Sequence, residues 1–171
     1  MKLPFKNTEK MKKQTEDQFL AEAVKIIWNE MPETRYCFFH IASEAKRSPI
    51  EWVQLKAKGF IAGCQDVQFI WSGTVYHIEL KDRSSGVISA DQAVIHCAHF
   101  NQGFPTYIFY DSETLVNFVK DVIKKGNEYT RSVYAKYHSP FCLPIEELPR
   151  LLIEVKRQDA LKKQRYTHRH K

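Results

Sequence analysis

Residues 66–81 read DVQFIWSGTVYHIELK, with runs of apolar, β-branched and aromatic residues on both sides of Ser72-Gly73. Such runs separated by two turn-forming residues predict a β-hairpin. With a two-residue turn, Trp71 pairs with Thr74, and pairing continues outward along both strands. The pattern therefore predicts both the hairpin and its register.

The predicted register brings two acids and a lysine together at the open end of the hairpin. Asp66 falls opposite Glu79, and Lys81 points to the same face two residues further along the strand. Like charges directly opposed across a hairpin are destabilising, so the two carboxylates require a cation, either the lysine or a divalent metal. We interpret the group as the geometry of a metal-dependent phosphodiesterase. The structural alternative is a surface hairpin with an ordinary salt bridge between Glu79 and Lys81.

The composition is that of one folded domain of ordinary size. The chain has 171 residues, and its 43% hydrophobic and 13% aromatic content excludes a largely disordered chain. A formal net charge of +6 would suit a polyanionic partner. The cysteines show no C-x-x-C spacing, which argues against a zinc ribbon and a disulfide framework. Because the sequence contains neither a membrane-spanning apolar run nor a signal peptide, we expect a cytoplasmic protein with no membrane partner.

Helical and strand periodicities predict an α/β core in the order αβαββαβα. A helix opens at residues 15–17 and ends before Pro32, and Ser89 is a good N-cap for the helix after the hairpin. The other expected elements are a strand at 36–41, a helix at 49–58, a strand at 106–110 and a helix at 112–125. We expect a mixed sheet flanked by helices.

Composition divides the chain into three parts. Residues 1–13 are polar and lysine-rich and predict a mobile basic arm, whereas residues 14–126 form the predicted core. Residues 127–171 form an aromatic loop and then a basic helix from 145 to about 165, which we expect to pack on the core. The loop tyrosines could stack on unpaired bases or pack beneath that helix.

Four segments together resemble a known family. They are FHIASEAKRS at 39–48, GFIAGCQD at 59–66, IELK at 78–81 and GVISADQ at 86–92. The combination resembles the stand-alone virus-type replication-repair nuclease domain, VRR-NUC, of the PD-(D/E)XK superfamily, over about residues 14–124. Two positions depart from the family pattern: Gln65 stands where proline is usual, and Ser43 where asparagine is usual. The resemblance implies a restriction-endonuclease-like α/β fold.

The resemblance also implies roles for the hairpin residues. Asp66, Glu79 and the Leu80 carbonyl would bind Mg²⁺ or Mn²⁺, hard cations that prefer oxygen ligands. Lys81 would position or deprotonate the attacking water and offset the charge that develops on the phosphate. Gln92, in the first turn of its helix, would orient the site or touch the phosphate. Its alternative role is a hydrogen bond from the helix start to the preceding loop.

The family carries one more glutamate, on the first helix. Glu16 is our choice as a further metal ligand, because it precedes Phe19 and Ala23 on the apolar stripe of that helix. Glu44 is the competitor, since it lies in a polar loop and could reach the metal or the DNA. An ordinary acid at a helix N-terminus is the alternative for Glu16.

Basic residues and one histidine are candidates for contacts with DNA phosphates. His96 shares a helix face with Gln92 and His99, and without a fitting third ligand we favour packing or a phosphate contact over zinc. The tail residues could instead form a solvated helix face. The candidate DNA-binding residues are Glu44, Lys46, Arg47, His96, Lys162, Lys163 and Arg165.

The resemblance implies a metal-dependent, structure-specific DNA endonuclease that uses no nucleotide cofactor. For compact stand-alone members, typical of bacteriophages, it implies a homodimer that cuts Holliday junctions, which would place the protein in the host cytoplasm. Symmetric nicks need two sites related by a two-fold axis, and one core of this size has one site. The alternatives are a flap, single-strand or nicking nuclease, a sequence-specific restriction-like enzyme, and a non-catalytic DNA-binding accessory module.

Overall fold

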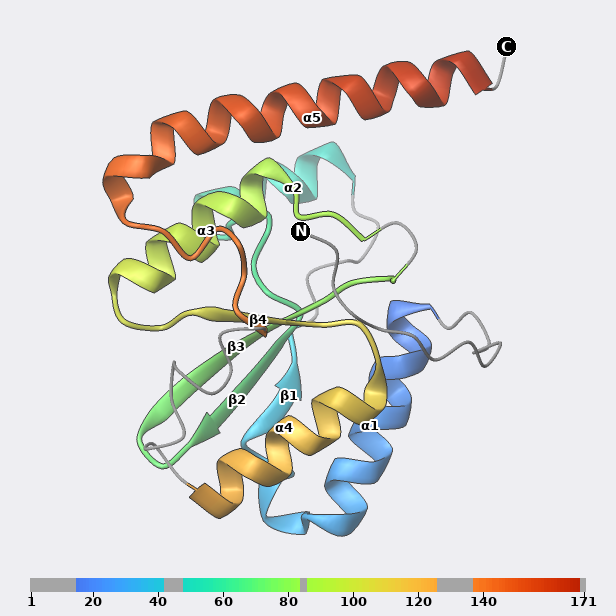
Figure 1. Ribbon diagram of the computed structural model, residues 1–171, viewed down its shortest axis with the longest axis vertical. Helices are drawn as coiled ribbons and strands as arrows, with labels where there is room; N and C mark the ends of the chain where they lie inside the picture. The colour runs from blue at the N-terminus through green and yellow to red at the C-terminus, as the bar shows by residue number, and fades with distance from the viewer. Residues whose placement is uncertain (1–14, 42–47, 84–85, 126–136, 170–171) are drawn as a thin grey trace.

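A four-stranded mixed sheet lies at the centre of the molecule (Figure 1), in a computed structural model that describes residues 15–41, 48–83, 86–125 and 137–169. The strands follow the order β1-β2-β3-β4 across the sheet. Antiparallel pairing joins the first three strands, and β4 runs parallel to β3. Their bounds are Phe38–His40 for β1, Val67–Trp71 for β2, Thr74–Leu80 for β3 and Thr106–Phe109 for β4. The predicted mixed sheet is confirmed.

The predicted hairpin register is confirmed as well. Trp71 pairs with Thr74, and the ladder runs to the pair Val67–Ile78. Ser72 and Gly73 have φ values of 48° and 75°, the pair of positive angles that a two-residue turn of type I′ requires. This turn matches the right-handed twist of the flanking strands, so it holds both strands in one register.

Helices cover both faces of the sheet, in the predicted order (Figure 1). On one face lie α1 (Glu16–Glu30) and α4 (Ser112–Lys125), which contact each other. On the other face lies α3 (Ala90–Asn101), with α5 (Leu148–Arg169) packed across it. The short helix α2 (Pro49–Ala57) precedes the hairpin and buries none of its side chains. In the part of the chain that the structure describes, no helix is both long and apolar enough to cross a membrane.

Capping boxes set where three of the helices begin. Thr15, Ser48 and Ser89 each accept a hydrogen bond from the backbone N–H three residues later, and the side chain at that later position accepts one from the cap residue. These reciprocal bonds satisfy backbone N–H groups that a helix start leaves without partners. The cap at Ser89 matters most here, because it fixes the first turn of α3 beside the end of β3.

The pleat of β3 divides its residues between two environments. Tyr76, Ile78 and Leu80 lie in the main apolar core with α1 and α4. His77 and Glu79 alternate with them and lie toward α3, where both are buried. Buried ionisable residues are rare unless they are paired, so the α3 side of this strand is where a functional site is expected.

The C-terminal part begins a few residues later than the sequence pattern predicts. A short 3₁₀ helix, η4 (Ile145–Glu147), precedes α5, which starts at Leu148. Val155 of α5 packs into a second apolar cluster with Ile108 of β4. Several expectations fall outside the described residues: the arm at 1–13, Glu44, Lys46 and Arg47, the tyrosines at 129 and 134, and the side chains of Lys162, Lys163 and Arg165.

Candidate active site

Glu79 lies at the centre of a buried polar cluster on the α3 side of the sheet. Its side chain is fully excluded from solvent. Its Oε1 accepts hydrogen bonds from the Lys81 ammonium and from the Gln92 side-chain amide. The lysine, itself almost buried, supplies the opposite charge that a carboxylate needs inside a protein. The predicted trio of Glu79, Lys81 and Gln92 is therefore held together by direct contacts.

Gln92 performs two tasks at once, and the sequence interpretation treated these as alternatives. Its Oε1 accepts a hydrogen bond from the Ser89 backbone N–H at 3.0 Å, which completes the capping box of α3. Its Nε2 donates to the carboxylate of Glu79. Because the helix cap fixes the amide, the donor aimed at Glu79 is oriented before any substrate binds.

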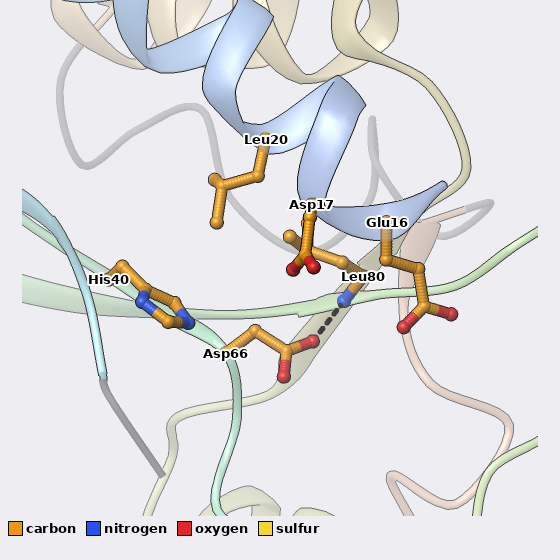
Figure 2. Close-up of a pocket in the computed structure, with 6 residues that line it drawn as sticks. All are labelled: Glu16, Asp17, Leu20, His40, Asp66 and Leu80. Atoms are coloured by element: carbon orange, nitrogen blue, oxygen red, sulfur yellow. Dashed lines mark hydrogen bonds between the residues drawn. The ribbon is translucent and has the colours of Figure 1, made fainter. Parts of the chain in front are cut away.

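Asp66 lies in a neighbouring acidic pocket instead (Figure 2). The pocket is lined by Glu16, Asp17, Leu20, His40, Asp66 and Leu80. Asp66 Oδ2 accepts a hydrogen bond of 2.7 Å from the Leu80 backbone N–H. Glu16 Oε1 accepts one of 2.7 Å from the Asp82 backbone N–H. The end of β3 thus holds one acid from the hairpin and one from α1.

The expectation that Asp66 faces Glu79 needs a correction of detail. The β2–β3 ladder ends at the pair Val67–Ile78, and Asp66 occupies a bend just before β2. From this bend its carboxylate bonds to the Leu80 backbone and lines the acidic pocket, whereas Glu79 lies in the polar cluster. Leu80, which lies between Glu79 and Lys81 in the sequence, lines the acidic pocket, so the pocket and the polar cluster meet at the end of β3.

The donor set of the acidic pocket fits a hard divalent cation. Glu16, Asp17 and Asp66 contribute carboxylates, and none of the described lysines or arginines lines the pocket. Mg²⁺ commonly binds through one or two carboxylates and keeps several waters, so it needs no closed cage of side chains. Among the described residues, no group of three or more His, Cys, Asp or Glu side chains is placed so that it could hold a metal ion. A cation in this pocket would therefore rest on fewer protein ligands, with water and substrate completing its shell.

Two glycines allow the site segments to approach closely. A Cβ on Gly63 would lie 2.7 Å from the backbone nitrogen of Gln92, so only glycine lets this turn sit against the start of α3. A Cβ on Gly86 would lie 2.6 Å from the Lys81 Cβ and 2.5 Å from the Asp82 carbonyl oxygen. Larger residues at either position would displace the backbone that carries Gln92 or Lys81.

A layer of neutral polar side chains continues the cluster along β3. Gln65 is buried and hydrogen-bonds His77 Nδ1. The His77 ring stacks on His99 at 4.2 Å between centroids. Burial, together with His99 and His96 nearby, lowers the pKa of His77 to about 4. His77 is therefore uncharged at neutral pH.

His96 does not lie where a phosphate contact would require it. The residue is on α3, one turn after Gln92, and its side chain is completely buried. Its Nδ1 lies 2.7 Å from the Ser139 hydroxyl, and its Nε2 lies 3.8 Å from Glu79 Oε2. His96 therefore lies beside the Glu79 carboxylate in the interior of the protein.

Sequence reasoning missed three residues that line or support these groups. Asp17 and His40 line the acidic pocket, and both had a local signal: Asp17 follows Glu16, and His40 lies in the segment that resembles the family. Ser139, which meets His96, had none. Its position depends on a pairing of the chain beyond α4 with β4, where the Ser139 N–H donates to the Thr106 carbonyl at 2.8 Å.

Helices cover both faces of a mixed sheet, and Glu79 and Lys81 lie at the end of β3. This arrangement is that of a restriction-endonuclease-like α/β fold. No protein-family model matches the sequence, and no curated protein matches it significantly. A solved structure described as a VRR_NUC domain protein is similar to this chain, with a TM-score of 0.52 and 18% sequence identity. The similarity covers 68% of this chain and 93% of that protein. It shows a shared fold and confirms the predicted fold class.

Proposed function

We propose that this chain is a metal-dependent DNA endonuclease. The main support is the buried Glu79 carboxylate, which Lys81 and Gln92 hold beside the acidic pocket of Asp66 and Glu16. Burying a carboxylate and an ammonium costs several kcal/mol per ion in desolvation, so such a pair is weak evidence for a purely stabilising role. Buried ionisable groups beside a pocket are typical of active sites.

In this proposal the acidic pocket binds the cation, and Lys81 at the end of β3 positions the attacking water. Asp66, Glu16 and the Leu80 carbonyl would hold Mg²⁺ or Mn²⁺, with Glu79 as the further acid of the site. The bound cation would supply Lewis-acid chemistry, lowering the pKa of water and polarising a phosphate oxygen. Lys81 orients the attacking water and offsets charge at the phosphorus. Water forms the new P–O bond and loses a proton to solvent, the bond to the leaving oxygen breaks, and that oxygen takes up a proton from solvent.

The proposed substrate is DNA, and the proposed preference is branched DNA cut by a homodimer. The net charge of +6 supports a polyanionic substrate. Paired cuts on a four-way junction need two sites related by a two-fold axis, and one chain supplies one site. A single-site nuclease would instead leave one nick or a ladder on flaps and single strands.

Cleavage assays test the proposal directly. The purified protein is incubated with a labelled four-way junction, a flap and a plain duplex, in Mg²⁺, Mn²⁺ or EDTA. Glu79→Gln serves as the site variant, and Glu113→Gln, at an exposed position on α4, as the matched control. We expect metal-dependent paired cuts on the junction, retained in the control and lost in the site variant.

Other outcomes separate the alternatives. A single metal-dependent nick or a ladder would support the flap or nicking nuclease. Metal-independent binding with no cut on any substrate would contradict the enzyme and leave a DNA-binding accessory module. Light scattering on the same samples measures the mass in solution and tests the dimer independently of cleavage.

A further inference from the structure

The second oxygen of the Glu79 carboxylate faces a buried histidine. Lys81 and Gln92 both bond to Oε1, so they leave Oε2 without a hydrogen bond in the part of the chain that the structure describes. His96 Nε2, also without a hydrogen bond there, lies 3.8 Å away. Both side chains are fully buried. Two buried polar atoms left facing each other are costly unless one donates toward the other.

Ser139 is the hydrogen-bond partner of Nδ1 in the His96 ring and favours one tautomer. The Ser139 Oγ accepts the Phe141 backbone N–H at 3.1 Å and lies 2.7 Å from His96 Nδ1. A serine hydroxyl has one hydrogen to donate, and here that hydrogen is available to Nδ1. A neutral imidazole that accepts at Nδ1 carries its hydrogen on Nε2.

The opposite tautomer is disfavoured by the carboxylate. With the hydrogen on Nδ1, the Nε2 lone pair would face the lone pairs of Glu79 Oε2 across a buried gap with no donor between them. With the hydrogen on Nε2, the N–H points at a negatively charged oxygen, which favours this arrangement electrostatically.

We propose that His96 is a positioning residue whose Nε2–H points at Glu79 Oε2 across 3.8 Å and orients it electrostatically, with its tautomer favoured by Ser139 and by the carboxylate together. The inference rests on the proposed function, because it assigns His96 a part in the same site. The carboxylate is then oriented from three directions: from the strand by Lys81, from the start of α3 by Gln92, and from behind by His96. It follows that the chain beyond α4, which carries Ser139, belongs to the working site.

The tautomer can be measured without any cleavage assay. Long-range ¹⁵N–¹H NMR spectra of the imidazole rings, with His96→Gln to assign the resonance, distinguish hydrogen on Nε2 from hydrogen on Nδ1. We expect the Nε2–H tautomer for His96 in the unmodified protein and a mixture of both in Ser139→Ala. The Nδ1–H form in the unmodified protein would overturn the inference, even if the protein cuts DNA.

Three substitutions on α3 test the positioning role. His96→Leu removes the donor, and His96→Gln keeps an amide that can donate toward Oε2. His99→Gln is the matched control, because His99 lies one turn further along the helix and stacks on His77. Changing a residue that supports an active-site ligand typically costs about 10–100-fold in activity or metal affinity, and we expect a loss of that size in kcat for His96→Leu. The KM for DNA should stay unchanged, and His96→Gln should recover most of the kcat.

Several results would contradict the positioning role. Equal losses in His96→Leu and His96→Gln, a change confined to KM, or full kcat in His96→Leu would each do so. Circular dichroism checks that the variants are folded, and Ser139→Ala replaces His96→Leu if that variant does not fold. Mn²⁺ binding measured by electron paramagnetic resonance, without DNA, should weaken in His96→Leu and persist in His99→Gln. If the unmodified protein cuts no DNA, the proposed function fails, while the tautomer and Mn²⁺ measurements still decide this inference.

Discussion

Lys81, directly after β3, and Glu79, near the end of that strand, form an ion pair whose side chains are 10% and 0% exposed. Removing one partner of such a pair leaves an uncompensated buried charge. We expect Lys81→Met to lower the free energy of unfolding by about 3 kcal/mol and to abolish cleavage. The double variant Lys81→Met/Glu79→Gln should regain most of this stability and remain inactive. Urea unfolding and the junction assay measure the two properties separately.

The double variant Lys81→Met/Glu79→Gln is the control for this experiment. If the double variant is no more stable than Lys81→Met, the ion pair does not explain the loss. If either variant cuts DNA at the unmodified rate, the pair has no part in catalysis.

The contact between Gly63 and the start of α3 predicts a pair of glycine variants with different outcomes. Gly63 and Gly59 have nearly equal φ values, 86° and 87°, so alanine is strained at both positions. An added Cβ at Gly63 meets the Gln92 backbone, whereas at Gly59 it meets nothing within 4 Å. Strain from positive φ costs about 1 kcal/mol, so we expect at least that loss in each variant. Only Gly63→Ala should also lose cleavage, since only it displaces Gln92.

Thermal unfolding and cleavage rates of the two variants check this expectation. Equal activity in Gly63→Ala and Gly59→Ala would show that the close approach is not needed for the site.

Asp111 should contribute stability that depends on pH. Burial raises the pKa of Asp111, but the hydrogen bonds from Thr114 and the Arg83 guanidinium lower it by more, so the net pKa is below its usual value. A carboxylate with a lowered pKa stabilises the folded state above the unfolded pKa of about 3.9, and this contribution is lost as pH falls through the folded pKa. Asp111→Asn keeps a cap for α4 but loses the charge. We expect it to be less stable than the unmodified protein at neutral pH.

Urea unfolding at neutral and acidic pH tests the sign of this effect. The difference between the two proteins should shrink as the pH is lowered. A difference that stays constant or grows would contradict the role of the Asp111 charge.

Divalent metal binding should depend on the acidic pocket. We expect Asp66→Asn to weaken Mn²⁺ binding and the double variant with Glu16→Gln to weaken it further, because each change removes a carboxylate from the acidic pocket. Isothermal titration with Mn²⁺ measures the affinity, with Glu113→Gln as the charge-matched control. Unchanged affinity for Mn²⁺ in the double variant would show that the cation binds outside this pocket.

Local rules predicted the parts of the fold that depend on neighbouring residues in the sequence. The hairpin followed from alternating apolar residues and a two-residue turn, and the start of α3 followed from Ser89 as a cap. The same rules place Gln92 beside the sheet but cannot show that one amide both caps the helix and binds Glu79.

The rest depends on contacts between distant segments. The bend at Asp66 directs its carboxylate to Leu80, which a regular extension of the ladder does not predict. Ser139 reaches His96 because the chain beyond α4 hydrogen-bonds to β4. No hydrophobic periodicity in the sequence indicates that pairing. The site roles themselves stay predictions until the variants are measured.

The Ser72-Gly73 turn is exposed and lies at the opposite end of the hairpin from Asp66 and Lys81, yet it helps to fix the register on which the site depends. A shift of one residue between β2 and β3 would exchange the two faces of β3. Glu79 would then enter the apolar core, and Leu80 would face α3. Because both turn positions have positive φ, glycine, asparagine and aspartate are the replacements expected to keep the two-residue turn, and with it the register that places Glu79 on the α3 face.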